Sequence, residues 1–150
     1  MGKVTTGGTM SLDGYIAGPD EGGFDLLFQW YGNGDVEIPS ASPDVPPPRI
    51  SAASAELIRP EWESTGALVV GRHLYDMTNA WGGRHPMNVT TVVLTHRRPE
   101  DRPADDENFV FVTDGIEAGS RSRPPATGSP RAKFSKSPPS VGRLPELSVA

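Results

Sequence analysis

Cysteine is absent from the 150 residues, so disulfide frameworks, thiolate nucleophiles and cysteine-based zinc sites are excluded together. Long apolar runs are also missing: no stretch of 18 residues suits a membrane span, and the N-terminus lacks the basic and apolar regions of a signal peptide. We therefore expect a cytoplasmic protein with no membrane contact. Apolar residues make up only 35%, whereas glycine and proline number 17 and 16, which predicts many turns within a single domain.

Basic residues are scarce in most of the chain. Residues 1–118 contain 8 Lys and Arg against 18 Asp and Glu, whereas residues 119–150 contain 6 against 1. An acidic body argues against nucleic-acid binding, because that affinity comes from cations that release counterions from phosphates. The C-terminal segment is dominated by Ser, Pro and Arg and has too little apolar surface to offset the entropy of ordering. We expect a disordered basic tail over 119–150, either natural or read from a shifted frame.

The N-terminal third predicts short elements between turns. Residues 3–9 have the β-branched content of a strand, residues 11–14 form a turn, and residues 15–17 begin a second extended piece. Residues 24–31 are apolar and aromatic and lie between glycine pairs, which predicts a short helix. Residues 36–49 contain five prolines and predict a surface loop.

The middle of the chain alternates helical and strand patterns. Ile50, Ala53 and Leu57 share one helical face after the N-cap candidate Ser51, and Pro60 predicts an end or kink near residue 59. Residues 67–70, 89–95 and 108–113 predict strands. Residues 73–79 predict a helix with Leu74 and Met77 facing inward, and Asp114 with Glu117 predicts a last helix that breaks at Gly119. Strands alternating with helices indicate an α/β fold with parallel pairing.

Five segments in this order carry a family resemblance: SLDGYIAG (11–18), FDLLFQW (24–30), ALVVGRHLYD (67–76), TTVVLTHR (90–97) and FVFVTDGIEA (109–118). Together with the strand expected at 3–9 they resemble the dihydrofolate-reductase-like family, which includes the reductase domain of bacterial riboflavin biosynthesis. The resemblance implies a mixed, mostly parallel sheet flanked by helices over residues 1–118. That sheet would be incomplete at its C-terminus, since the family's later helix, Gly-Gly phosphate turn and closing strands are not recognisable after residue 118.

The resemblance also implies an NADPH-dependent oxidoreductase that transfers hydride to a pteridine- or pyrimidine-like heterocycle. A helix N-terminus and cationic side chains favour dinucleotide phosphates, and the pair His96 and Arg97 favours NADPH over NADH. The implied cofactor residues are Ile16, Ala17, Gly71, Arg72, His73, Thr95, His96 and Arg97. Gly71 and Arg72 could instead form a tight turn with a solvated arginine.

On the substrate side, the resemblance implies Asp13, Gly14 and Phe28, with Asp25 as the catalytic acid. A carboxyl group beside aromatic side chains can have a raised pKa and assist protonation of a substrate nitrogen. Asp25 is equally explained as a first-turn residue stabilised by the helix dipole, and Asp13 as the holder of an Asx turn. The three histidines are too scattered to predict a metal site. The alternative function is a non-catalytic fragment that pairs its exposed sheet edges with a second copy, as a homodimer.

Overall fold

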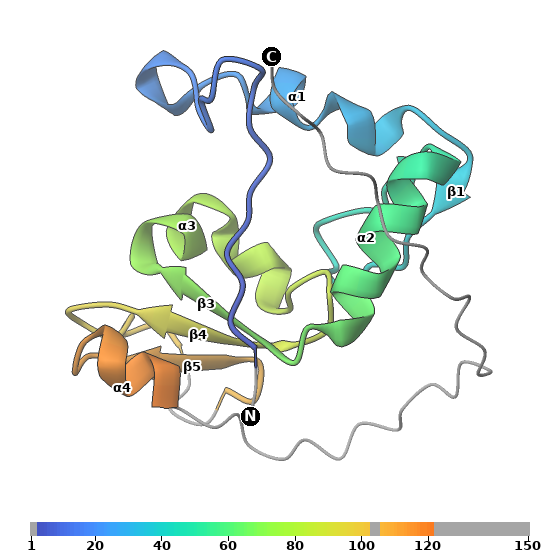
Figure 1. Ribbon diagram of the computed structural model, residues 1–150. Coiled ribbons are helices and arrows are strands. Elements are labelled where there is room, and N and C mark those ends of the chain that lie inside the picture. The colour runs from blue at the N-terminus through green and yellow to red at the C-terminus, as the bar shows by residue number, and fades with distance from the viewer. Residues whose placement is uncertain (1–2, 103–105, 122–150) are drawn as a thin grey trace.

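The computed structural model describes residues 3–102 and 106–121, so most of the expected tail, residues 122–150, lies outside the described residues. The α-helices are α1 (Phe24–Leu27), α2 (Ala52–Ser64), α3 (Arg72–Met77) and α4 (Ile116–Arg121), and the 3-10 helices are η1 (Pro19–Glu21), η2 (Gln29–Gly32) and η3 (Asn79–Gly83). The strands are β1 (Val36–Glu37), β2 (Arg49–Ile50), β3 (Ala67–Gly71), β4 (Thr90–Leu94) and β5 (Phe109–Val112). Figure 1 shows their arrangement.

A three-stranded parallel sheet in the order β3-β4-β5 confirms the expected α/β class. The central strand β4 is the most buried, with Thr91 and Val93 both at 0% exposure, because it has neighbours on both edges. Its β-branched residues suit a pleated surface that is covered on both faces. The sheet therefore forms at the three strands that the sequence predicts, with no end shifted by more than one residue.

Helices α3 and α4 cover opposite faces of this sheet (Figure 1). On one face, Tyr75 of α3 packs with Trp81, Val93 and Phe109 in the main core. The prediction that Leu74 and Met77 face inward is wrong, since they are 39% and 44% exposed while Tyr75 is 4% exposed. A six-residue helix makes fewer than two turns, so the one aromatic side chain that reaches the sheet decides which face is buried.

On the other face, α4 lies against β4. The expected break at Gly119 is wrong, because α4 continues through Gly119 to Arg121. Gly119 is buried, and a Cβ atom at this position would overlap the Leu94 side chain. The missing side chain thus lets the helix approach the sheet.

A second, smaller core is built from the β1–β2 hairpin, η2 and α2. Ile38, Ile50 and Ala55 are buried there, and Ile58 and Trp62 pack against them. Ser51 caps α2 as predicted, since its Oγ accepts a hydrogen bond from the Ser54 amide at 3.2 Å.

The predicted apolar face of α2 is wrong, and of the end or kink predicted near residue 59, the end does not occur. Leu57 is 74% exposed, Ile50 belongs to β2, and the helix runs through Pro60 to Ser64. The inward face is formed instead by Ala55, Ile58 and Trp62, which straddle the proline. Packing of these side chains therefore holds the helix together on both sides of Pro60.

The predicted strands at residues 3–9 and 15–17 are absent, and these residues have no regular secondary structure. The segment runs as an extended tube in Figure 1, and Val4 is 93% exposed. The adjacent Gly7 and Gly8 weaken a strand, because glycine loses much backbone entropy when it is ordered and has no side chain to pack. At residues 11–15 the backbone closes a turn instead: the Ser11 amide donates to the Tyr15 carbonyl at 2.8 Å and the Gly14 amide to the Ser11 carbonyl at 3.0 Å.

The two cores are joined by the loop that precedes β2. Ser42 Oγ donates a hydrogen bond to the Trp81 carbonyl at 2.6 Å, and the Ala41 amide donates to the Pro86 carbonyl at 2.9 Å. In the part of the chain that the structure describes, no helix has the length and apolar character needed to cross a membrane.

Candidate functional site

A pocket of about 610 Å³ opens where the three parallel strands end. Ligands of open α/β sheets bind at the carboxyl ends of strands, because the loops that leave the strands diverge there. The last residue of β4, Leu94, and the last residue of β5, Val112, supply apolar lining. The other lining residues are Arg72, Thr95, His96, Arg97, Thr113 and Gly115.

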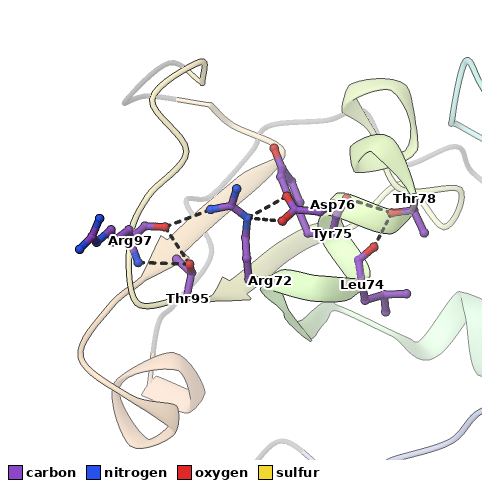
Figure 2. A network of polar contacts seen from close by, with 7 residues as sticks. All are labelled: Arg72, Leu74, Tyr75, Asp76, Thr78, Thr95 and Arg97. Carbon is purple, nitrogen blue, oxygen red and sulfur yellow. Dashed lines mark hydrogen bonds and ion pairs between the residues drawn. The ribbon is translucent and has the colours of Figure 1, made fainter. Parts of the chain in front are cut away.

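Arg72 is the first residue of α3, directly after β3, and its guanidinium group is held from two sides (Figure 2). Its Nε donates to both carboxylate oxygens of Asp76, at 2.7 and 2.8 Å. Its Nη1 donates to the Arg97 carbonyl at 3.1 Å. The spacing of four residues places Arg72 and Asp76 on one side of the helix. The arginine is therefore oriented before any ligand arrives.

The turn after β4 is closed by the side chain of Thr95. Its Oγ1 donates to the Arg97 carbonyl at 2.7 Å and accepts from the Arg97 amide at 3.3 Å (Figure 2). The Thr95 amide donates to the Val112 carbonyl at 3.1 Å, which continues the pairing with β5 by one residue. The Arg97 carbonyl thus accepts from both Arg72 and Thr95 and links α3 to this turn.

The charged side chains that line the pocket are those of arginines. Arg72 and Arg97 both line it, His96 adds an imidazole ring, and the eight lining residues include no Asp or Glu. Asp76 offsets part of the Arg72 charge from the side. Such a pocket can accept a negatively charged group at its cationic residues and apolar surface at Leu94 and Val112.

The shifted pKa values belong to groups outside this lining. Burial lowers the pKa of His85 to about 4, and it raises that of Tyr31. The pKa of Tyr75 is raised by burial, with Arg102 opposing that change. None of the three lines the pocket, so these shifts bear on stability and not on the candidate site.

The pocket brings together four of the eight predicted cofactor residues: Arg72, Thr95, His96 and Arg97. Gly71 directly precedes them as the end of β3. His73 does not line the pocket, and its Nε2 lies 2.6 Å from Glu21 Oε1 in an exposed pair. Ile16 is 68% exposed and Ala17 half-buried, and both lie in the N-terminal loop outside the pocket lining.

The predicted substrate and catalytic residues also lie outside the pocket lining. Asp13 and Gly14 are exposed in the turn at residues 11–15, where Asp13 accepts a hydrogen bond from Ser11 Oγ at 2.6 Å. Asp25 is exposed on α1, and Phe28, 37% exposed, follows that helix. Their roles stay predictions.

Sequence reasoning missed five residues of this arrangement: the lining residues Leu94, Val112, Thr113 and Gly115, and Asp76, which orients Arg72. Two signals could have found them. The ends of neighbouring parallel strands meet at one edge, which places the residues after β5 beside those after β4. The Arg-x-x-x-Asp spacing on a helix predicts an ion pair.

Comparisons of the chain with protein-family models, with curated proteins and with solved structures found no match.

Proposed function

We propose that the protein is an NADPH-dependent reductase that transfers hydride to a pteridine- or pyrimidine-like heterocycle. The pocket at the strand ends is the observation that carries the proposal, because it gathers Arg72, His96 and Arg97 around apolar surface. A dinucleotide has phosphate groups that can bind the arginines of this lining and a flat base that can pack on its apolar residues. The position agrees with the general location of nucleotide sites in parallel sheets.

The residues present fit the phosphate-bearing end of NADPH. Arg72 has Nε and Nη1 engaged by protein oxygens, whereas Nη2 has no acceptor within residues 3–102 and 106–121 and can donate to a phosphate oxygen. Arg97 and His96 are exposed and can add charge-assisted bonds. NADPH would supply the hydride, while the chain binds and orients it.

The substrate would be bound by the N-terminal loop and α1, in this proposal. Asp25 is exposed next to Phe24 and close to Phe28 in the sequence, and the two aromatic rings are stacked with centroids 6.3 Å apart. A flat heterocycle can pack on such rings while the carboxyl group donates a proton to a ring nitrogen.

Titration of the chain with NADPH, followed by nicotinamide fluorescence, tests the proposal. We expect saturable binding, weakened at least tenfold in Arg72→Ala and in Arg97→Ala, since each removes a charge-assisted bond worth about 1.5 to 3 kcal/mol. Arg84→Ala is the matched control, because Arg84 is an exposed arginine outside the pocket lining. Equal affinity in all four proteins, or no binding by a folded chain, would refute the cofactor site.

Turnover tests the chemistry separately. Oxidation of NADPH is followed by loss of the absorbance of the reduced nicotinamide, with oxidised pteridines and pyrimidines as candidate hydride acceptors. Asp25→Asn keeps the shape of the side chain and removes the acid. We expect it to lower kcat by about 100-fold or more, with the NADPH affinity unchanged. An unchanged kcat would remove Asp25 from the reaction.

Self-association is a second candidate function, favoured by two observations on β3. Val69 of β3 is 51% exposed although parallel sheets are ordinarily covered on both faces, and the outer edge of β3 has no partner strand in the described part of the chain. Sedimentation of the protein over a range of concentrations tests it. A homodimer that Val69→Lys converts to a monomer supports pairing at β3, and a concentration-independent monomer rules it out.

A further inference from the structure

The carboxylate of Asp76 lies beside Arg72, the pocket arginine whose guanidinium group is hydrogen-bonded on two sides. Both of its oxygens accept from Arg72 Nε, at 2.7 and 2.8 Å, and the Arg97 carbonyl fixes Nη1 at 3.1 Å. Figure 2 shows the guanidinium group lying between these two acceptors. The orientation of Arg72 therefore depends on a carboxylate that does not itself line the pocket.

We propose that Asp76 is a positioning residue for ligand phosphate: it holds Arg72 so that the free Nη2 edge of the guanidinium is presented to a phosphate oxygen. The inference rests on the proposed function, because it concerns the same pocket. An arginine side chain loses conformational entropy when it binds an anion, and an arginine that is already oriented loses less. Asp76 supplies that orientation from four residues further along α3.

The carboxylate has two opposite effects on an anionic ligand. Its negative charge repels phosphate, whereas its hydrogen bonds keep Arg72 in place. Both side chains are substantially exposed, at 37% for Arg72 and 51% for Asp76, so solvent screens the repulsion. The positioning effect is screened less, because it acts between atoms in direct contact, at 2.7 and 2.8 Å. We therefore expect positioning to outweigh repulsion, which makes the sign of a substitution at Asp76 diagnostic.

The network extends beyond the ion pair. The Arg97 carbonyl that accepts from Arg72 also accepts from Thr95 Oγ1 at 2.7 Å. Release of Arg72 would remove one of the two bonds that hold this carbonyl, in the turn that carries His96 and Arg97. Loss of Asp76 is thus expected to loosen the arginine and the turn together.

Binding of NADPH and of inorganic pyrophosphate to Asp76→Ala and Asp76→Glu tests the inference. Asp76→Ala should raise Kd for both ligands by about 3- to 10-fold, the cost of ordering one rotamer-rich side chain. Asp76→Glu retains a carboxylate for Arg72 and should restore most of the affinity. Glu63→Ala, which removes an exposed carboxylate from α2 outside the pocket lining, should leave Kd unchanged.

The outcomes separate the inference from the proposed function. Unchanged or tighter binding by Asp76→Ala would overturn the inference, since charge alone would then govern the site. If the unaltered chain binds pyrophosphate but not NADPH, the reductase proposal fails, while the pyrophosphate affinities still decide the role of Asp76. Binding of neither ligand overturns both.

A spectroscopic measurement on the unaltered chain does not depend on how well the variants fold. The Arg72 Nε–H proton should exchange with water more slowly than that of the exposed Arg84, because both Asp76 oxygens accept from it. Exchange as fast as that of Arg84 would overturn the positioning role.

Discussion

Acidification should destabilise the protein through His85. The Met87 amide donates to His85 Nδ1 at 3.2 Å, so this nitrogen must be an unprotonated acceptor. The ring also packs edge-on against Trp81, with centroids 4.6 Å apart. Protonation would break the hydrogen bond and place a charge on a partly buried ring. Burial accordingly lowers the pKa of His85 to about 4.

The sign and size of the effect follow from linkage between protonation and folding. The unfolded chain has a histidine pKa near 6.5, so between pH 6.5 and 4 the unfolded state binds more protons than the folded state. The stabilising contribution is present in full above pH 6.5 and is lost as the pH falls toward 4. The free energy of unfolding should drop by about 2 kcal/mol between pH 7.5 and 5, and by about 3 kcal/mol in total.

Urea denaturation at several pH values measures this loss, with His85→Asn as the matched variant. Asparagine keeps a side-chain acceptor close to the position of Nδ1 but does not titrate in this range. Subtraction of the variant's pH profile removes the contribution of carboxylates, which also titrate below pH 5. If the two profiles run parallel between pH 7.5 and 5, the reasoning about His85 is wrong.

Two substitutions test the packing. Gly34→Ala should lower the free energy of unfolding by about 1 to 3 kcal/mol in urea titrations, because its Cβ would overlap the backbone carbonyl of Ile50. Tyr75→Phe should leave the melting temperature unchanged or raise it in calorimetry, because the buried Tyr75 hydroxyl has no hydrogen-bond partner among the described residues and an unsatisfied hydroxyl costs about 1 to 3 kcal/mol.

For each of these two substitutions, a specific stability result would contradict the prediction. Gly32→Ala is the control for Gly34, since a Cβ at Gly32 meets no atom within 4 Å. Equal stabilities of the two alanine variants would contradict the predicted overlap. For Tyr75→Phe, a fall of more than 1 kcal/mol in stability would show that the hydroxyl is satisfied after all.

Patterns that span a few residues predicted the sheet well. The three strands are short apolar, β-branched runs, and such runs favour a pleated backbone whatever surrounds them. Ser51 was predicted as an N-cap for a similarly local reason, because its hydroxyl reaches the Ser54 amide three residues ahead. These features depend on neighbours in the sequence, so the sequence alone is sufficient for them.

Features that depend on distant partners were not predicted. Residues 3–9 have strand composition, but composition does not supply a neighbouring strand, and without one the segment stays irregular. The buried faces of α2 and α3 were misassigned because periodicity identifies several apolar faces on a short helix. Ala55 is buried because it packs with Ile50 of the β1–β2 hairpin, and Tyr75 is buried because it packs with Phe109, which lies far away in the sequence.

The candidate site combines local and long-range features, and its geometry explains why four of its eight lining residues could be predicted. Arg72 directly follows β3, and Thr95, His96 and Arg97 are the first three residues after β4. Parallel strands bring the residues at their carboxyl ends to one edge without further information. The residues expected to bind substrate come from the irregular N-terminal loop and α1. Glu21, in the same N-terminal region, pairs with His73 of α3, and both side chains are more than half exposed, so this contact contributes little stability. In the proposed reductase, this N-terminal region would have to close over the pocket when ligand binds, whereas the pocket at the strand ends is already formed.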